Sequence, residues 1–233
     1  MRPLVVVPTF NERDNLPTLL ERLLRHDGLR VLVVDDASPD GTGRIADEWV
    51  AANRARVQVL HRSGARGLGL SYIDGIYLAL RTDATHICQM DADLSHDPDD
   101  LPRLITATAD ADVAIGSRYV PGGRIEGWAA HRRMLSAFAN WYIRSVTGLT
   151  IRDCTGGFRC WRREVLERLP LGSLRSDGYA FVVELVFEAN RAGFRCSEVP
   201  ITFVERRQGA SKLSGRVLLE SVVMPWRLVS SKR

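Results

Sequence analysis

The sequence lacks the patterns that mark several common classes of protein. Its four cysteines form no C-x-x-C pair, which argues against a zinc site and a disulfide framework, so we expect reduced thiols. No stretch reaches the length and apolarity of a transmembrane helix. The chain passes from its first residues directly into an apolar run, without the basic-then-apolar layout of a signal peptide. We therefore expect a protein that resides in the cytosol.

Lysine is scarce, because 30 of the 32 basic residues are arginine, and arginine suits bidentate binding of phosphate. Residues 1–112 carry 12 basic and 18 acidic side chains, a net charge of −6. Residues 113–233 carry 20 basic and 10 acidic side chains, a net charge of +10. An acidic half suited to a metal is thus followed by a basic half suited to anions. No basic helix with interleaved aromatic residues is present, so we expect no nucleic-acid partner.

Short apolar runs alternate with amphipathic segments in the first half of the chain. The runs predict strands at Leu4–Pro8, Val31–Asp35, Val57–His61, His86–Asp91 and Val113–Ser117, with helices near 12–26, 42–53, 68–81 and 98–109. This alternation is typical of βαβ units and of a mainly parallel sheet.

The second half is less regular. Its pattern predicts helices over 132–147 and 178–191, a strand over Arg195–Val204, and an amphipathic segment from about Leu213 that Pro225 interrupts. The segment at 132–147 is apolar nearly all round the helix. The chain contains neither repeats nor a linker, so we expect a single domain over residues 1–233.

Three of the predicted strands end in polar clusters, which are Asp91-Ala92-Asp93, residues 8–12 (PTFNE) and residues 34–42 (VDDASPDGT). Parallel strands bring their carboxyl ends to one edge of the sheet, where open α/β folds bind ligands. With Mg²⁺ or Mn²⁺ the two aspartates could hold a pyrophosphate, because these ions prefer carboxylate and phosphate oxygens. No G-x-G-x-x-G follows the first strand, so the dinucleotide-binding fingerprint is absent.

Several cations are candidates for binding phosphate near this edge. Arg118 follows the fifth predicted strand, and Arg206 and Lys212 belong to a glycine-containing loop that could close over phosphates. Arg132 and Ser136 open the helix predicted at 132–147, whose N-terminus favours anions. The histidines show no ligand spacing, and we expect no catalytic role for His61, His86, His96 or His131.

Together these residues resemble the polyprenol (dolichol) phosphate mannosyltransferases, a group within glycosyltransferase family 2. The matching stretches are PTFNE at 8–12, VVDDASPDGT at 33–42, GLGLSYIDG at 67–75, DADLSHDP at 91–98, GSRYVPGG at 116–123, DCTGGFRCWRREVLE at 153–167, DGYAF at 177–181 and RRQGASK at 206–212. They span nearly the whole chain in the order found in that family. The resemblance implies an α/β fold of the GT-A type, with a mainly parallel central sheet flanked by helices.

The resemblance also implies roles for individual residues. Contacts with the nucleoside of GDP-mannose would come from Pro8, Phe10, Glu12, Val34 and Asp36. The diphosphate would lie along Asp91, Ala92 and Asp93, with both aspartates near Mg²⁺ or Mn²⁺. Arg118, Arg206 and Lys212 would neutralise the donor phosphates, and Arg132 and Ser136 would meet the acceptor phosphate. Residues 1–112 would then form a nucleotide- and metal-binding half, and residues 113–233 an acceptor-binding half.

The acceptor implied by the resemblance is a polyprenyl phosphate, which lies in a membrane. We therefore expect a protein peripheral to the cytoplasmic face of a membrane. The apolar helix at 132–147 and the amphipathic end at 213–229 could lie in the membrane interface, or they could pack against the core or a partner. A membrane-anchoring subunit or domain is among the partners that the resemblance allows.

Other functions remain compatible with the sequence. The donor could be UDP-glucose or another nucleotide sugar. A glycan hydroxyl could replace the phosphate acceptor, and would call for a carboxylate base such as Asp153, Asp177 or Glu184. The chain could also be a non-catalytic nucleotide-sugar-binding subunit of a membrane complex. A nucleotidyltransferase is a weaker alternative, because no glycine-rich phosphate loop lies near the N-terminus.

Overall fold

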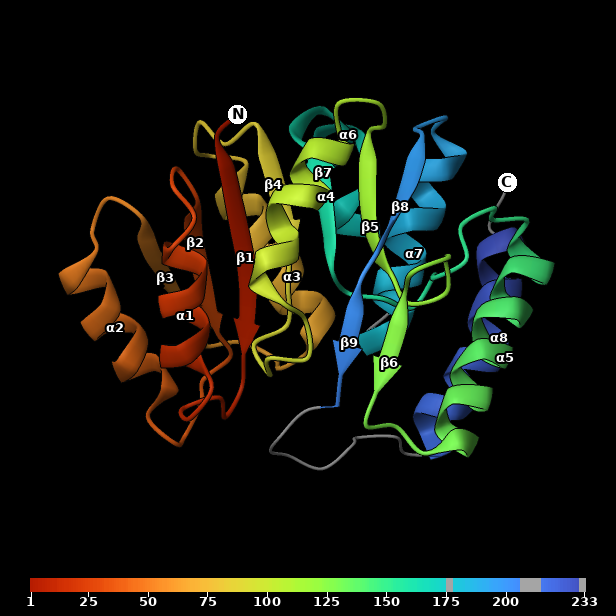
Figure 1. Ribbon diagram of the computed structural model, residues 1–233, viewed down its shortest axis with the longest axis horizontal. Helices are drawn as coiled ribbons and strands as arrows, with labels where there is room; N and C mark the ends of the chain where they lie inside the picture. The colour runs from red at the N-terminus through yellow and green to blue at the C-terminus, as the bar shows by residue number, and fades with distance from the viewer. Residues whose placement is uncertain (175–177, 206–214, 231–233) are drawn as a thin grey trace.

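A seven-stranded sheet with the strand order β3-β2-β1-β4-β7-β5-β8 forms the centre of the molecule (Figure 1). The computed structural model describes residues 1–174, 178–205 and 215–230, with the backbone alone for Tyr179 and residues 215–221. The strands are β1 (Pro3–Thr9), β2 (Arg30–Asp35), β3 (Val57–His61), β4 (His86–Gln89), β5 (Val113–Ser117), β6 (Arg124–Glu126), β7 (Arg159–Arg162), β8 (Cys196–Pro200) and β9 (Thr202–Val204).

Helices cover both faces of this sheet (Figure 1). They are α1 (Leu16–Leu24), α2 (Thr42–Ala52), α3 (Leu68–Ala79), α4 (Leu101–Ala107), α5 (Ala130–Thr147), α6 (Arg163–Arg168), α7 (Gly178–Arg191) and α8 (Gly215–Ser230), with 3-10 turns at Pro98–Asp100 and Leu171–Ser173. The predicted fold class is confirmed, because strands β1 to β4 pair in parallel and are flanked by helices.

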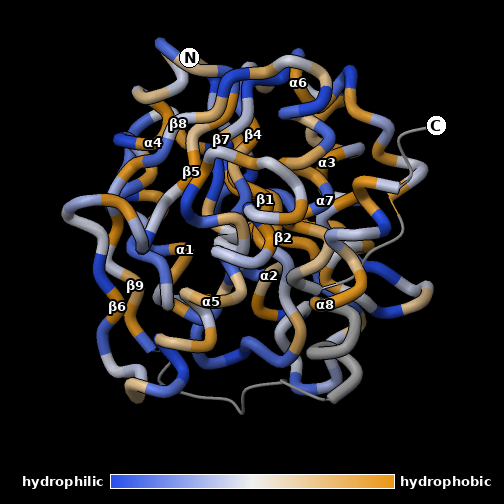
Figure 2. The backbone as a smooth tube through the Cα atoms, turned by 90° about the vertical axis from the view of Figure 1, so that its right-hand side faces the viewer, coloured by the Kyte–Doolittle hydropathy of each residue, from blue (hydrophilic) through white to orange (hydrophobic). Residues whose placement is uncertain are grey.

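The two-residue period of β1 explains the two layers of the core. Val5 and Val7 pack with the buried leucines of α1 on one face of the sheet. Leu4 and Val6 pack on the other face, together with residues of α3 and α7. A strand that is buried on both faces reads as a continuous apolar run, as this one does. Figure 2 shows the hydrophobic residues of β1 and β2 in the interior.

Strand β7 is, with β6 and α6, among the elements that the sequence pattern did not reveal. It runs antiparallel between β4 and β5, with Cys160 opposite Cys88. Its sequence, RCWR, begins and ends with arginine, which hides it from a search for apolar runs. Arg159 is nevertheless fully buried, because its guanidinium donates to the carbonyl oxygens of Gly156 and Cys154 at 2.9 and 2.8 Å.

Two further predictions about the second half were wrong in detail. The single strand predicted over Arg195–Val204 is divided at Ile201, because β8 joins the main sheet and β9 pairs with β6 in a small second sheet. Pro225 was predicted to interrupt the terminal segment, yet α8 continues through it to Ser230. The helix tolerates the proline while it packs along α5, where the Tyr142 hydroxyl donates to the carbonyl of Val222 at 2.8 Å.

Candidate active site

The carboxyl ends of β1, β2 and β4 lie along one edge of the sheet, as predicted. Within the described part of the chain, three non-glycine residues have a positive φ, namely Asn11 at 60°, Ala37 at 54° and Leu94 at 59°. Each lies a few residues beyond one of these strands: Asn11 and Ala37 are inside two of the polar clusters, and Leu94 directly follows the third. Residues other than glycine rarely adopt this backbone conformation, and those held in it tend to gather at functional sites. Backbone geometry thus marks the same three loops as the polar residues.

A cavity of about 250 Å³ opens at this edge and brings several predicted residues together. Asp91 and Asp93 line it, and so do Arg118, Arg132 and Ser136. The lining then becomes apolar where the cavity extends between α5 and α8, through Leu135, Phe138, Ala139, Tyr142, Ile143, Val222 and Met224. One cavity therefore has anionic, cationic and apolar side chains in its lining.

Both aspartates of the D-x-D triplet are held by hydrogen bonds from neighbouring groups. The Tyr72 hydroxyl donates to Oδ1 of Asp91 at 3.0 Å. The backbone N–H of Ser95 donates to Oδ1 of Asp93 at 3.0 Å. Burial, with the Asp91 charge beside it, raises the pKa of Tyr72 well above its usual value, so this hydroxyl keeps its proton and acts as a donor. Ala92, between the aspartates, is buried.

The donor set at this triplet fits a divalent cation that is shared with a diphosphate. Among the described residues, no group of three or more His, Cys, Asp or Glu side chains could hold a metal ion by itself. Mg²⁺ in nucleotide enzymes is typically held by one or two carboxylates and completed by substrate phosphates. The backbone of Gly157 passes close to the triplet, since a Cβ there would lie in van der Waals contact, 3.5 Å from both carboxylate oxygens of Asp91.

The residues predicted to contact a nucleoside gather at the ends of β1 and β2. The carboxylate of Asp36 pairs with the guanidinium of Arg62 and accepts the backbone N–H of Gly67 at 2.9 Å. The guanidinium of Arg66 lies over the ring of Phe10, 4.6 Å from its centroid. The carboxylate of Glu12 accepts the side-chain amide of Asn15 at 2.7 Å.

Pro8 and Val34 lie opposite each other in the β1–β2 register, and both are buried. The side chain of Val34 belongs to the hydrophobic core. A nucleoside placed here would therefore meet the backbone of Val34 and not its side chain.

Arg118 lies in the cavity wall, but its charge is engaged by a partner that the sequence did not suggest. Its Nε and Nη2 atoms donate to the two carboxylate oxygens of Asp153 at 2.8 and 2.7 Å, and Nη2 also donates to Thr155 at 2.9 Å. Burial disfavours ionised Asp153, but the Arg118 charge and hydrogen bonds outweigh it and hold the pKa of this carboxyl below its usual value. Asp153 is thus a fully buried partner of Arg118 that does not line the cavity, which argues against a role as the general base.

The residues predicted for the acceptor phosphate lie at the start of α5. Arg132 pairs with Glu205 at 2.6 Å and lies over the ring of Trp128, 4.0 Å from its centroid. The hydroxyl of Ser136 accepts that of Tyr119 at 2.7 Å. Arg206, Lys212 and Asp177 fall outside the described residues.

His96, for which no catalytic role was expected, lines the cavity together with the two aspartates. It is 2% exposed, and its ring stacks on Phe158 with a centroid distance of 5.0 Å. Burial lowers its pKa, so the imidazole is neutral near pH 7. Its Nδ1 atom is buried without a hydrogen-bond partner among the described residues. Its place three residues beyond Asp93 is the only signal in the sequence that pointed to it.

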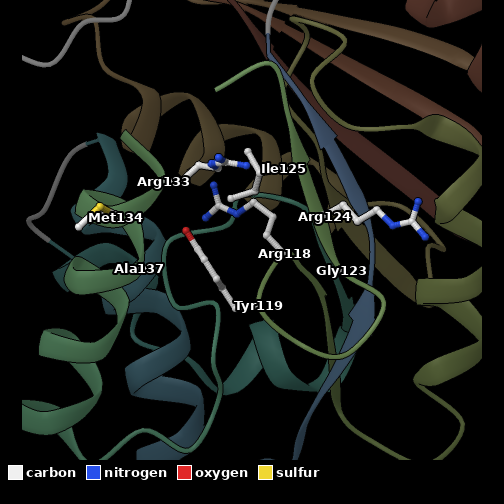
Figure 3. A pocket seen from close by; sticks show the side chains of 8 residues that line it. All are labelled: Arg118, Tyr119, Gly123, Arg124, Ile125, Arg133, Met134 and Ala137. Carbon is white, nitrogen blue, oxygen red and sulfur yellow. The ribbon is translucent and has the colours of Figure 1, made fainter. Parts of the chain in front are cut away.

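A second, more open hollow of about 330 Å³ lies beside Tyr119 and the first part of α5 (Figure 3). Arg118, Arg124 and Arg133 line it together with Met134. In Figure 3 Arg118 and Arg133 extend into the hollow, whereas Arg124 extends away from them. Three arginines therefore line this hollow beside α5.

Comparison with known proteins agrees with this geometry. The chain is 48% identical over 225 residues to the polyprenol monophosphomannose synthase of Mycolicibacterium smegmatis, covering 95% of this chain and 84% of that relative. It is 46% identical over 226 residues to the undecaprenyl-phosphate mannosyltransferase of Micrococcus luteus, covering 96% and 92%.

Solved structures with this fold are more distant in sequence. The mannosyltransferase PcManGT of Pyrobaculum calidifontis, in complex with GDP-Man and Mn²⁺, superposes with a TM-score of 0.64 at 19% identity, covering all of this chain and 65% of that one. Glucosyl-3-phosphoglycerate synthase of Mycobacterium tuberculosis, in complex with Mn²⁺ and UDP, superposes with a TM-score of 0.67 at 16% identity, covering 98% and 77%. The fold is therefore that of the GT-A enzymes. The family model for glycosyl transferase family 2 matches residues 4–170, and the chain belongs to this family.

Proposed function

We propose that the protein transfers mannose from GDP-mannose to a polyprenyl monophosphate, with inversion at the anomeric carbon. The observation that carries this proposal is the single cavity that joins Asp91 and Asp93 to Arg132 and Ser136 and then to the apolar lining between α5 and α8. A lipid phosphate suits this lining, because its anionic head matches the cationic residues and its apolar chain matches the apolar residues. The names of the two relatives at 46–48% identity support the same donor sugar and the same class of acceptor.

The donor diphosphate would lie against Asp91 and Asp93, which would hold a divalent cation with it. Two distant structures of this fold were solved with Mn²⁺, and carboxylate oxygens also bind Mg²⁺. A bound cation supplies positive charge that stabilises the departing diphosphate. Arg206 and Lys212 would add further charge to the leaving group, and the pairing with Asp153 would fix Arg118 in the cavity wall.

The reaction is one displacement in which an oxygen of the acceptor phosphate attacks the anomeric carbon. The new carbon–oxygen bond forms as the bond to the diphosphate breaks, and the electron pair of that bond leaves with GDP. A phosphate monoester has a second pKa of about 6 and is largely dianionic at neutral pH, so the attack needs no strong general base. The pairing of Asp153 with Arg118 agrees with this, because the most buried candidate base is committed to another role. Catalysis then rests on alignment and on charge stabilisation.

The outer surface of α5 and α8 supports a location on a membrane. Met134, Phe138 and Trp141 on α5 are 73%, 58% and 58% exposed, and Trp226 on α8 is 60% exposed. Exposed apolar and aromatic side chains gathered on adjacent helices are typical of interfacial helices. No helix in the described residues is long and apolar enough to cross a membrane. We place the protein on the cytoplasmic membrane face, with these helices in the interface beside the opening for the lipid, or against a membrane-anchoring subunit.

The test is transfer of label from GDP-mannose into a chloroform-extractable polyprenyl phosphate product. Matched reactions contain UDP-glucose in place of GDP-mannose, or EDTA in place of Mg²⁺ or Mn²⁺. We expect label in the organic phase with GDP-mannose and metal, and its loss with EDTA. Label transferred from UDP-glucose in preference to GDP-mannose would contradict the donor assignment. Transfer that persists in EDTA would contradict the role of Asp91 and Asp93.

A further inference from the structure

We propose that Tyr72 is a positioning residue for the cation, acting through Asp91. The inference rests on the proposed role of Asp91 as a ligand of a divalent cation. The Tyr72 hydroxyl donates to Oδ1 of Asp91 at 3.0 Å, and the aspartate lines the cavity. Tyr72 itself is fully buried, so it reaches the site only through this one hydrogen bond. It lies in the middle of α3, on a different element from the D-x-D triplet, so sequence spacing gives no sign of the contact.

The position of Tyr72 is fixed by the packing of α3 on the sheet. Gly75, one turn further along α3, lets the helix backbone approach β1 and β2 closely. A Cβ at this position would lie 2.5 Å from Val6 and 2.9 Å from Val34, which is closer than such atoms pack. The ring of Tyr72 also lies nearly parallel to that of Phe181 on α7, with centroids 6.0 Å apart and 8° between the planes. The hydroxyl is therefore presented to Asp91 by a rigid support.

A second support lies next to the same carboxylate. A Cβ at Gly157 would lie 3.5 Å from both carboxylate oxygens of Asp91, so the backbone of this loop passes close to the aspartate. The buried guanidinium of Arg159 holds the loop by donating to the carbonyl oxygens of Gly156 and Cys154. Asp91 thus has a fixed hydroxyl from α3 and a fixed backbone from the loop before β7.

This arrangement matters because a cation binds best to a carboxylate that is already oriented. Groups that hydrogen-bond to metal ligands fix the ligand's rotamer, and their removal typically costs about 10–100-fold in metal affinity or activity. The Tyr72→Phe substitution removes the hydroxyl and keeps the ring that packs on Phe181. We therefore expect the dissociation constant of Mn²⁺ to rise by about 10-fold or more, because Asp91 gains rotational freedom.

The experiment measures Mn²⁺ binding directly, without turnover. Free Mn²⁺ is followed by its electron paramagnetic resonance signal while protein that contains GDP is titrated with MnCl₂. Tyr77→Phe is the matched control, because Tyr77 is on the same helix, is 42% exposed and does not line the cavity. We expect wild-type affinity for Tyr77→Phe and weaker binding for Tyr72→Phe. The midpoint of thermal unfolding shows whether Tyr72→Phe is folded in the titration.

Transfer kinetics provide the second readout. A positioning role predicts that Tyr72→Phe needs more Mn²⁺ for half-maximal transfer, with kcat at saturating Mn²⁺ close to wild type. Equal Mn²⁺ dissociation constants for folded Tyr72→Phe and the wild type would overturn the inference, as would a wild-type protein that binds no Mn²⁺ with GDP. Wild-type protein that binds Mn²⁺ with GDP but transfers no mannose would instead overturn the proposed function, and the comparison of Tyr72→Phe with Tyr77→Phe would still decide the role of Tyr72.

Discussion

Replacing Asp153 by asparagine gives a sharp test of how this site works, because two mechanisms predict opposite outcomes. In the structure Asp153 is the buried partner of Arg118, with side-chain exposures of 0% and 7%. It accepts three N–H groups of Arg118, from the backbone, Nε and Nη2. Asp153→Asn keeps the size of the side chain but removes its charge. The guanidinium of Arg118 is then buried without a counter-ion. The NH₂ group of the asparagine also faces the N–H donors of Arg118, with which it cannot form hydrogen bonds.

The expected cost follows from this burial. Removing one partner of a buried ion pair typically destabilises a protein by about 3–5 kcal/mol, because the remaining charge stays out of water. For a chain of this length, each kcal/mol shifts the unfolding midpoint by about 2–4 °C, which gives a fall of roughly 6–20 °C. Calorimetry and urea unfolding of Asp153→Asn and wild-type protein measure this difference.

The dependence of the effect on pH has a definite sign. The folded-state pKa of Asp153 lies below its usual value, since the Arg118 charge and hydrogen bonds outweigh the cost of burial. The stabilisation is therefore fully present above the unfolded pKa of about 3.9 and is lost as the pH falls through the lower folded pKa. The asparagine of Asp153→Asn does not titrate. The difference in unfolding free energy between the two proteins should thus be largest near neutral pH and shrink below about pH 4.

Activity separates the two mechanisms. If Asp153 positions Arg118, transfer by Asp153→Asn should fall mainly in step with the fraction of protein that is unfolded. If Asp153 were the general base of a hydroxyl acceptor, its loss should lower kcat by about 10²–10⁴-fold in folded protein. A variant with wild-type stability and such a loss of kcat would refute the structural reasoning and favour a hydroxyl acceptor.

Three further predictions concern other parts of the site. Asp93→Ala should lower transfer by roughly 10²–10³-fold with folding intact, by analogy with the removal of one donor from an oxyanion hole, and steady-state kinetics with Mn²⁺ measure it. Trp141→Glu with Trp226→Glu should reduce cosedimentation with phospholipid vesicles while a short-chain, water-soluble polyprenyl phosphate is still used, because neither tryptophan lines the cavity; unchanged cosedimentation would contradict the interfacial placement of α5 and α8. Gly75→Val should destabilise the fold by about 1–3 kcal/mol in urea unfolding, because its side chain meets Val6 and Val34.

Much of the first half of the chain could be predicted because its signals are local. The apolar runs of β1 and β2 are buried on both faces, and the leucines of α1 repeat at helical spacing. These strands and helices, and the sheet edge at the carboxyl ends of the strands, can therefore be predicted from neighbouring residues. The polar clusters at the strand ends follow from the same alternation. Strand β7 could not be found this way, because Arg159 is buried through hydrogen bonds to backbone carbonyls that only the folded chain supplies.

The parts of the site that were missed depend on long-range contacts. Arg118 lines the cavity, but its pairing with Asp153 spans 35 residues and has no local signal. His96 was set aside because its spacing matches no metal-ligand pattern, yet folding places it between Phe158 and Phe203 in the cavity wall. The proline at 225 was taken to interrupt a helix, whereas packing of α8 along α5 overrides the local preference.

The most direct test of the central claim compares two acceptors that differ only in the phosphate. Purified wild-type protein is given labelled GDP-mannose and Mn²⁺ with either polyprenyl phosphate or the corresponding polyprenol. The account predicts mannosylated lipid with polyprenyl phosphate and none with polyprenol, because the site proposed at Arg132 and Ser136 suits a phosphate, and Asp153 is buried as the partner of Arg118 and does not line the cavity. Equal transfer to the polyprenol, or transfer to neither lipid while a glycan is mannosylated, would contradict it.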